Sequence, residues 1–212
     1  MDTRSKSEKF WDRTAIYYDK EEKKDEPTYL KFIENAGKYL KVNDTVLDFG
    51  CGTGLVSNEI ADNVKMVYAF DISSKMIEIG RDKATELKIQ NIDYLKTTIF
   101  DERFKCDSFD AILIFNVLHL LNDSQEVIRR IYELLKPEGY IISATPCMGE
   151  KPLLNSLFSI GSKIGITPEI KSFKTVEFDN LFIKANFEII ETDYLKKNSP
   201  QYLVIAKKLK RV

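Results

Sequence analysis

The sequence predicts an α/β fold in which helices cover both faces of one mostly parallel β-sheet. Between residues 45 and 145, short apolar runs alternate with segments of helical periodicity, and turn signals separate them. One run is continuously hydrophobic, as is typical of a strand that is buried on both faces. Strands that alternate with helices imply parallel pairing with right-handed crossovers. The 212 residues suffice for one sizeable core, so a single domain is expected.

The first half of this alternation contains two strands, each followed by a helix. Residues 45–50 predict a buried strand, and residues 55–63 carry apolar side chains on one helical face. Residues 65–71 predict the second strand. The helix expected over residues 73–88 begins with a serine N-cap signal and has apolar positions at roughly helical spacing.

The second half contains the strand expected at the centre of the sheet. Residues 92–98 predict a weaker strand, whereas the apolar run 111–115 suits a strand covered on both faces. A helix is expected over residues 124–139, where a proline and a glycine provide stop signals. The next strand should then occupy residues 140–145.

The rhythm changes on both sides of this region. Residues 1–44 predict helices that pack against the sheet or over its ligand crevice. Residues 152–166 are apolar but interrupted by glycines, and predict either a lid over the crevice or a buried helix. A further helix is expected over residues 175–187. Residues 187–195 and 201–209 predict an antiparallel hairpin that closes one edge of the sheet.

Composition and charge argue against several classes of protein. Hydrophobic residues make up 43% of the chain and charged residues 31%, values typical of globular domains. The formal net charge of -1 provides no general attraction to nucleic acid. No apolar stretch approaches the about 18 residues of a membrane span, and the first residues lack a secretory signal, which predicts a cytoplasmic protein. The three cysteines are scattered, so neither a disulfide framework nor a metal is expected.

A glycine-rich loop follows the first strand of the core. The stretch VLDFGCGTGL places Gly50, Gly52 and Gly54 directly after that strand. In an open α/β sheet this loop borders the ligand crevice, and glycines allow a ligand to approach the main chain closely. The alternative interpretation is that the glycines only permit a tight turn.

An acidic residue at the end of the second strand narrows the class of ligand. Asp71 lies 71 − 52 = 19 residues after Gly52, a spacing at which a carboxylate can accept both hydroxyls of a ribose. A phosphate-binding loop would require a lysine and a hydroxyl where residues 55–57 read LVS, which disfavours ATP and GTP. A dinucleotide fingerprint would require glycine instead of Leu55, so NAD is a strained alternative. The remaining interpretation is a nucleoside cofactor without phosphates, whose amino-acid tail lies near Asp48.

These motifs resemble those of a known family. The stretches VLDFGCGTG and AFDIS resemble the first two motifs of class I S-adenosylmethionine (SAM) dependent methyltransferases, including the pattern D-x-G-x-G-x-G. The resemblance extends over residues 45–145, and the C-terminal hairpin agrees with the family's antiparallel seventh strand. It implies a Rossmann-like, doubly wound, mostly parallel seven-stranded sheet with an antiparallel last strand. The N-terminal pattern is similar to that of the quinone-biosynthesis and general small-molecule methyltransferase group.

The resemblance implies SAM as the cofactor and S-adenosyl-L-homocysteine (SAH) as its product. It places Thr98, Ile99 and Phe100 along the adenine, with Ile99 donating a backbone N–H to the ring, and Asn116 and Val117 beside the methionine portion. Thr98 departs from the family's common aspartate, because a hydroxyl accepts a hydrogen bond without charge assistance. The residues expected to bind the cofactor are Asp48, Gly50, Cys51, Gly52, Gly54, Asp71, Ile72, Met76, Thr98, Ile99, Phe100, Asn116 and Val117.

Two residues are candidates for a catalytic role. His119 is the only histidine and follows the central strand, where it could take a proton near neutral pH; its alternative role is structural or cofactor-contacting. Tyr18 resembles the tyrosine of an A-x-x-Y-D segment that closes over the methyl group in small-molecule members, and its alternative role is core packing. A base is optional, because positioning alone supplies much of the rate of such a transfer. The sequence has no suitable set of carboxylates around this position for metal-dependent methyl transfer. Residues 116–119 read NVLH rather than N-P-P-Y, which argues against the enzymes that methylate amino groups of DNA.

The predicted function is therefore transfer of a methyl group from SAM to a small-molecule acceptor. Two alternatives are a non-catalytic SAM- or nucleoside-binding module and an NAD-dependent oxidoreductase. The expected regions are an N-terminal helical cap (1–44), a cofactor-binding core (45–145), a lid insertion (146–173), and a last helix with the hairpin (174–212). Residues expected to line the acceptor pocket are Trp11, Tyr17, Leu154, Leu157 and Phe158.

Overall fold

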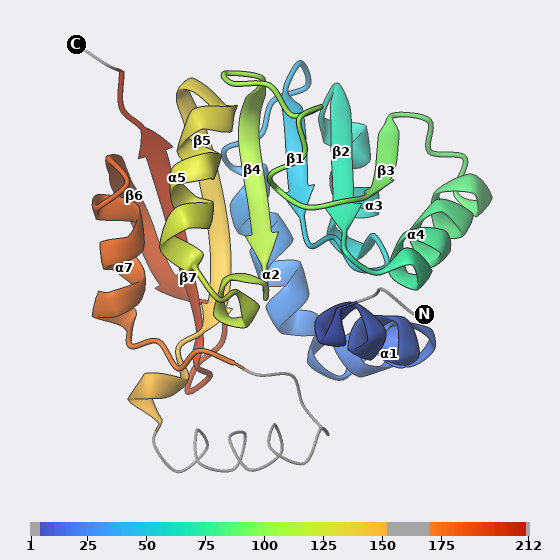
Figure 1. Ribbon diagram of the computed structural model, residues 1–212, viewed down its shortest axis with the longest axis horizontal. Helices are drawn as coiled ribbons and strands as arrows, with labels where there is room; N and C mark the ends of the chain where they lie inside the picture. Colours follow the sequence, from blue (N-terminus) through green and yellow to red (C-terminus); the bar gives the residue numbers. More distant parts are fainter. Residues whose placement is uncertain (1–4, 152–169, 211–212) are drawn as a thin grey trace.

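The computed structural model describes residues 5–151 and 170–210. Its centre is a seven-stranded sheet with the strand order β3-β2-β1-β4-β5-β7-β6 (Figure 1). Neighbouring strands from β3 to β5 pair in parallel, whereas β7 runs antiparallel to both β5 and β6. The strands are β1 (Thr45–Phe49), β2 (Met66–Asp71), β3 (Ile92–Lys96), β4 (Phe109–Phe115), β5 (Leu135–Pro146), β6 (Phe187–Tyr194) and β7 (Gln201–Lys208). The predicted fold class and the C-terminal hairpin are confirmed.

Helices cover both faces of this sheet. On one face, α2 (Glu26–Gly37), α3 (Leu55–Ile60) and α4 (Ser74–Glu86) bury Phe32, Ile60 and Ile77 against Val46 and Leu113. On the other face, α5 (Ser124–Leu134) and α7 (Thr175–Ile183) bury Ile128 and Phe182 against Leu47 and Ile112. Consecutive strand residues thus point to opposite layers, as strand geometry requires. Short 3₁₀ helices span Lys23–Asp25, Ala61–Asn63, Leu118–Leu120 and Met148–Glu150.

Strand β4 is the fourth of the seven strands, as its apolar sequence predicts. It pairs with β1 on one side and β5 on the other, and its residues from Ala111 to Ile114 are 0% exposed. A strand with both faces covered cannot alternate between apolar and polar residues, which explains the continuous run.

Helix α1 (Lys6–Glu22) lies on neither face of the sheet. It crosses the end of the sheet where β2 leads into α4, as Figure 1 shows. Ser5 caps the helix by accepting a hydrogen bond from the N–H of Glu8, and Ala15 is its buried residue. Of the two placements left open by the sequence for the N-terminal helices, α1 occupies the one over the crevice.

The junction between α5 and β5 differs from the prediction. The helix ends at Leu134 and the strand begins at Leu135, so Pro137 and Gly139 do not separate them. Leu135 pairs with Phe109, and the register then shifts before Ala111 pairs with Tyr140. This irregularity accommodates the proline within the strand, because a bulge needs no continuous ladder of hydrogen bonds.

The segment expected to form a lid, with Leu154, Leu157 and Phe158, lies outside the described residues. The boundaries of the four expected regions stay predictions. Among the helices in residues 5–151 and 170–210, none has the length and apolar character needed to cross a membrane.

Candidate functional site

A pocket opens where β1, β2 and β4 end, and α1 forms its far wall. Its empty space, including the part that is open to solvent, is about 630 Å³. Strand ends, their loops, the helices α1 and α4 and the 3₁₀ helix Leu118–Leu120 contribute to it, so it joins segments that are distant in the sequence. It is lined by Ser7, Trp11, Tyr18, Phe49, Gly50, Gly52, Phe70, Asp71, Ile72, Met76, Phe115, Asn116, Val117, Leu120 and Leu121.

The glycine loop after β1 forms the floor of the pocket. Gly50 has φ +68°, and a Cβ there would lie 2.4 Å from Cγ2 of Val117. Both features restrict this position to glycine. The N–H groups of Gly50 and Cys51 donate to the carbonyl of Phe70, at 2.9 and 3.0 Å, which fastens the loop to β2.

Gly52 and Gly54 have different surroundings. Gly52 lines the pocket, and a Cβ at this position would lie closest to the ring of Tyr18. Gly54 is the N-cap residue of α3 and lies beneath Tyr94, whose hydroxyl leaves no space for a Cβ. The third glycine of the motif therefore serves packing between α3 and β3.

Asp71 ends β2 and presents its carboxylate at the pocket. Its Oδ2 accepts a hydrogen bond from the N–H of Gly52 (3.1 Å), and its Oδ1 accepts one from the N–H of Ser73 (2.8 Å). Burial raises the pKa of Asp71 to about 6, and the charge of Asp12 adds to the shift, whereas these backbone donors oppose it. The carboxylate thus holds the loop after β1 and the turn after β2 in one arrangement.

Asp48 lies deeper, beside a second and smaller hollow that adjoins the glycine loop. It is 2% exposed, and its Oδ2 accepts a hydrogen bond from the hydroxyl of Ser57. Burial raises the pKa of Asp48 to about 7, against the effect of Ser57. Cys51 lines the same hollow, and burial raises the pKa of its thiol well above the usual value.

Helix α1 contributes Tyr18, which lines both hollows. Burial raises the pKa of Tyr18 well above its usual value, and the charge of Glu22 adds to the shift. Glu22 lines the second hollow as well, and burial raises the pKa of its carboxyl. Tyr18 is therefore a neutral phenol near pH 7.

Asn116 and Val117 line the pocket directly after β4. Asn116 has φ +59°, a conformation that asparagine tolerates better than most residues. Its Oδ1 accepts a hydrogen bond of 2.9 Å from Nε2 of Gln201 on β7, which sequence reasoning did not identify. No motif marks Gln201, because only the hairpin's tertiary placement brings it here.

Several predicted residues do not line the described pocket. Ile99 is 2% exposed and packs in the core with Phe104, whereas Thr98 is exposed and Phe100 is 49% exposed. Tyr17 is 61% exposed, in contrast to the neighbouring Tyr18. The expected adenine contacts of residues 98–100 stay predictions.

His119 lies in the 3₁₀ helix Leu118–Leu120 and is 9% exposed. It is absent from the residues that line the pocket, although Leu120 and Leu121 are among them. Burial lowers the pKa of His119 to about 4, so the imidazole is neutral at pH 7. Within the part of the chain that the structure describes, its Nδ1 has no hydrogen-bond partner.

Phe49, Phe70 and Phe115 are pocket residues that sequence reasoning missed. Each lies at or next to the carboxyl end of its strand, and the first two rings stack with centroids 4.8 Å apart. An aromatic residue in that position is the signal that could have identified them.

No cluster of three or more His, Cys, Asp or Glu side chains suited to a metal ion occurs in residues 5–151 and 170–210.

Comparison with known families gives one match over most of the chain. A family model described as a methyltransferase domain matches residues 40–203. This range contains the glycine loop, Asp71 and the whole sheet except the end of β7.

Relatives of similar sequence carry methyltransferase names. The chain is 31% identical over 114 residues to phosphoethanolamine N-methyltransferase 2 of Caenorhabditis elegans, covering 53% of this chain and 26% of that protein. It is 29% identical over 139 residues to a demethylmenaquinone methyltransferase of Listeria monocytogenes, covering 61% and 59%. It is 32% identical over 129 residues to a ubiquinone biosynthesis O-methyltransferase of Pasteurella multocida, covering 56% and 52%. The chain thus spans about a quarter to three fifths of the lengths of these relatives.

Solved structures share the fold. A chain of the complex between the Haloferax volcanii Trm112 methyltransferase activator and a methyltransferase matches with a TM-score of 0.79 at 16% identity, covering 99% of this chain and 100% of that one. A SAM-dependent methyltransferase of Methanosarcina mazei matches with a TM-score of 0.68 at 22% identity, covering 82% and 96%. At such identities these matches show the fold alone.

Proposed function

The chain belongs to the methyltransferase-domain family, and on that premise we propose that it transfers a methyl group from SAM to a small-molecule acceptor. The observation that carries the proposal is the meeting of Gly50, Gly52 and Asp71 around one pocket at the carboxyl ends of β1 and β2. Open α/β sheets bind nucleoside cofactors in this place.

The groups around the two hollows fit SAM. The Asp71 carboxylate suits two ribose hydroxyls, and the ring of Phe70 with Ile72 and Met76 suits an apolar base. The second hollow is lined by Asp48 and Glu22, whose carboxyl groups suit the ammonium group of an amino-acid tail. Neither hollow has a lysine or arginine among its described lining residues, whereas a cofactor with phosphates would require positive charge or backbone cradles.

The chain's own residues contribute mainly positioning and exclusion of water. When bound, SAM supplies a methyl group already activated by the positive sulfur. Trp11, Tyr18, Leu120 and Leu121 provide an apolar and aromatic wall against which an acceptor can be held. Such positioning is worth about 7 to 11 kcal/mol of the barrier. Tyr18, as a neutral phenol, can orient an acceptor by a hydrogen bond but is a poor base near pH 7.

A small-molecule acceptor is supported by two features. The relatives above are named for phosphoethanolamine, demethylmenaquinone and ubiquinone biosynthesis, and α1 lines the pocket with Ser7, Trp11 and Tyr18. The net charge of -1 offers no general attraction to nucleic acid. The cytoplasmic location expected from the sequence stays a prediction.

Cofactor binding tests the first half of the proposal. SAM and SAH at about 100 times their dissociation constants should each raise the free energy of unfolding by about 2.7 kcal/mol, and NAD should not. Asp71→Ala should weaken SAM binding by about 2 to 4 kcal/mol in calorimetry, because charge-assisted bonds are lost. Asp82→Asn, an exposed acid on α4, serves as the control. Weakening by Asp71→Ala of less than threefold would rule out the role of this carboxylate.

Methyl transfer tests the second half. The protein, incubated with methyl-labelled SAM and a cell extract, should place label in the small-molecule fraction, and Asp71→Ala should reduce it. Label confined to protein or nucleic acid would contradict a small-molecule acceptor. Tight SAM binding without any labelled product would favour a non-catalytic binding module instead.

A further inference from the structure

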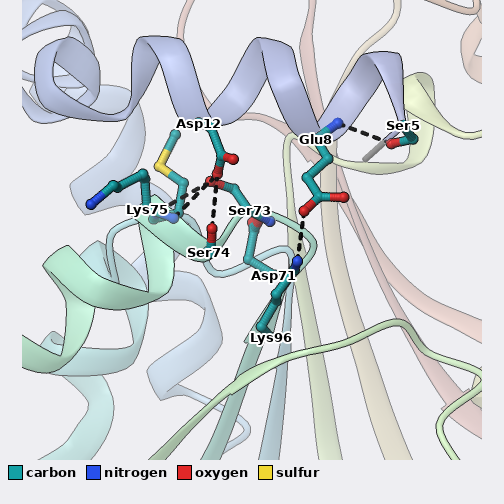
Figure 2. Close-up of polar contacts among 9 residues, drawn as sticks. Ser5, Glu8, Asp12, Asp71, Ser73, Ser74, Lys75 and Lys96 are labelled. Atoms are coloured by element: carbon teal, nitrogen blue, oxygen red, sulfur yellow. Dashed lines mark hydrogen bonds and ion pairs between the residues drawn. The ribbon is translucent and has the colours of Figure 1, made fainter. Parts of the chain in front are cut away.

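Acidic side chains fasten α1 to the rest of the molecule at three points. Glu8 pairs with Lys96 at the end of β3, with 2.6 Å between Oε1 and Nζ. Asp19 pairs with Lys83 on α4 at 2.8 Å. Between these two contacts, Asp12 meets the start of α4 (Figure 2).

Asp12 receives several donors on one oxygen. Its Oδ1 accepts hydrogen bonds from the hydroxyls of Ser73 (2.7 Å) and Ser74 (3.5 Å) and from the N–H of Lys75 (3.2 Å). These donors belong to the N-cap and first turn of α4, where N–H groups lack partners within the helix and the helix dipole favours negative charge. Asp12 therefore acts as a second cap for α4, supplied by a different helix.

Ser73 connects this cap to the pocket. Its N–H donates to Oδ1 of Asp71 at 2.8 Å, while its hydroxyl donates to Asp12 and accepts from the N–H of Met76 at 3.1 Å. The residue is fully buried, and both Asp71 and Met76 line the pocket. One serine thus joins the α1 carboxylate to two residues that face the ligand.

The same helix carries one wall of the pocket. Ser7, Trp11 and Tyr18 line it, and their spacings of four and seven residues place them on one helical face. Trp11 is adjacent to Asp12 in the sequence, so any shift of α1 at Asp12 also moves this wall.

We propose that Asp12 is a positioning residue that holds the turn from Asp71 to Ser73 in its ligand-binding arrangement and keeps α1 closed over the pocket. Occupation of the Asp71 site and closure of α1 are then coupled through Ser73. The identity of the ligand in this inference rests on the proposed function, but the closure of α1 does not.

The closure can be tested without any ligand. Trp11 is the only tryptophan of the chain, so its fluorescence reports the pocket wall alone. In Asp12→Ala, acrylamide should quench Trp11 clearly more than in the wild type, toward the value of the urea-unfolded chain. Asp12→Asn keeps an acceptor oxygen and should retain most of the protection. Glu21→Gln removes a 60%-exposed acid from the same helix and is the matched control.

Release of SAH tests the coupling. Followed by Trp11 fluorescence in stopped flow, SAH should dissociate about tenfold faster from Asp12→Ala, equivalent to about 1.4 kcal/mol. Asp12→Asn should restore most of the wild-type rate, and Glu21→Gln should leave it unchanged. Circular dichroism verifies folding, and Asp12→Ser replaces Asp12→Ala if the alanine variant does not fold.

Two results would overturn the inference. One is that acrylamide quenches Trp11 in Asp12→Ala, or in Asp12→Ser, no more than it does in the wild type. The other is a wild-type rate of SAH release in these variants. If SAH does not bind the wild type, the proposed function fails, whereas the quenching experiment still decides whether Asp12 closes α1.

Discussion

The glycines after β1 are required by the protein's own side chains as well as by a ligand. A Cβ on Gly50 would meet Val117 after β4, and one on Gly54 would meet the hydroxyl of Tyr94 on β3. The loop therefore packs against neighbours from both sides of β1. The simple interpretation that only a ligand excludes side chains here is incomplete.

Gly50→Ala should destabilise the fold by about 1 to 3 kcal/mol, because it combines a left-handed backbone with a contact of 2.4 Å to Val117. Urea unfolding measures this change. Val117→Ala in the same chain removes the contact but not the backbone strain, so the double variant should recover only part of the loss. A change within about 0.5 kcal/mol for Gly50→Ala would contradict this account of the loop.

Buried carboxylates make the stability of the ligand-free protein depend on pH. The pKa values of Asp48 (about 7) and Asp71 (about 6) lie above the usual value of about 4 for an unfolded chain. The folded state then binds more protons, so the free energy of unfolding should rise by about 1 kcal/mol as the pH falls from about 8 to 6.5. Below about pH 6.5, His119 has the opposite effect, because its pKa is lowered to about 4 in the folded state and the unfolded chain binds the proton more readily.

Urea unfolding at both pH values measures the effect, and Asp48→Asn should remove most of it. Equal or greater stability of the wild type at the higher pH would contradict the raised pKa values. The affinity for SAM, which carries a net positive charge, should fall as the pH falls from about 8 to 6.5, because protonation of Asp71 and Asp48 removes negative charge from the site.

At the scale of elements, α1 and β4 are opposites. The residues of β4 from Ala111 to Ile114 are fully buried, whereas Ala15 is the buried residue of α1. The attachment of α1 to the rest of the protein depends on ion pairs such as Glu8–Lys96 and Asp19–Lys83. Dissolved salt weakens such pairs by screening their charges. Helix α1 is therefore expected to be the less stable element.

Hydrogen exchange should show this difference. Amides of α1 should exchange faster than those of β4 and α5, and raising the ionic strength from about 0.05 to 0.5 M should accelerate α1 alone. Mass spectrometry of peptides from the three elements measures it. Protection of α1 equal to that of α5, or insensitive to salt, would mean that apolar packing rather than charge holds the helix.

Periodicity predicted most elements because burial of one or both faces determines it. The apolar run of β4 and the serine cap of α4 are examples, and Ser73 indeed accepts the N–H of Met76. The start of β5 at Leu135 was missed, since a bulge can place a proline within a strand. The exact docking of α1 was also beyond sequence reasoning, because Asp12 and Ser73 are 61 residues apart.

At the scale of the whole molecule, the position of the site follows from the topology. Parallel strands bring their carboxyl ends together, so the sequence predicted that Gly50 and Asp71 would share one region, and the family resemblance implied the same for Asn116; all three line the pocket. Contributions from outside this pattern, such as Gln201 on β7 and the wall formed by α1, depend on tertiary contacts that no motif reports.

A crystal structure of the protein with SAH tests the central claim most directly. We expect the ribose hydroxyls on the carboxylate of Asp71, the amino-acid tail beside Gly50 and Asp48, and α1 closed over the ligand. SAH bound elsewhere, or bound with its ribose away from Asp71, would contradict the account.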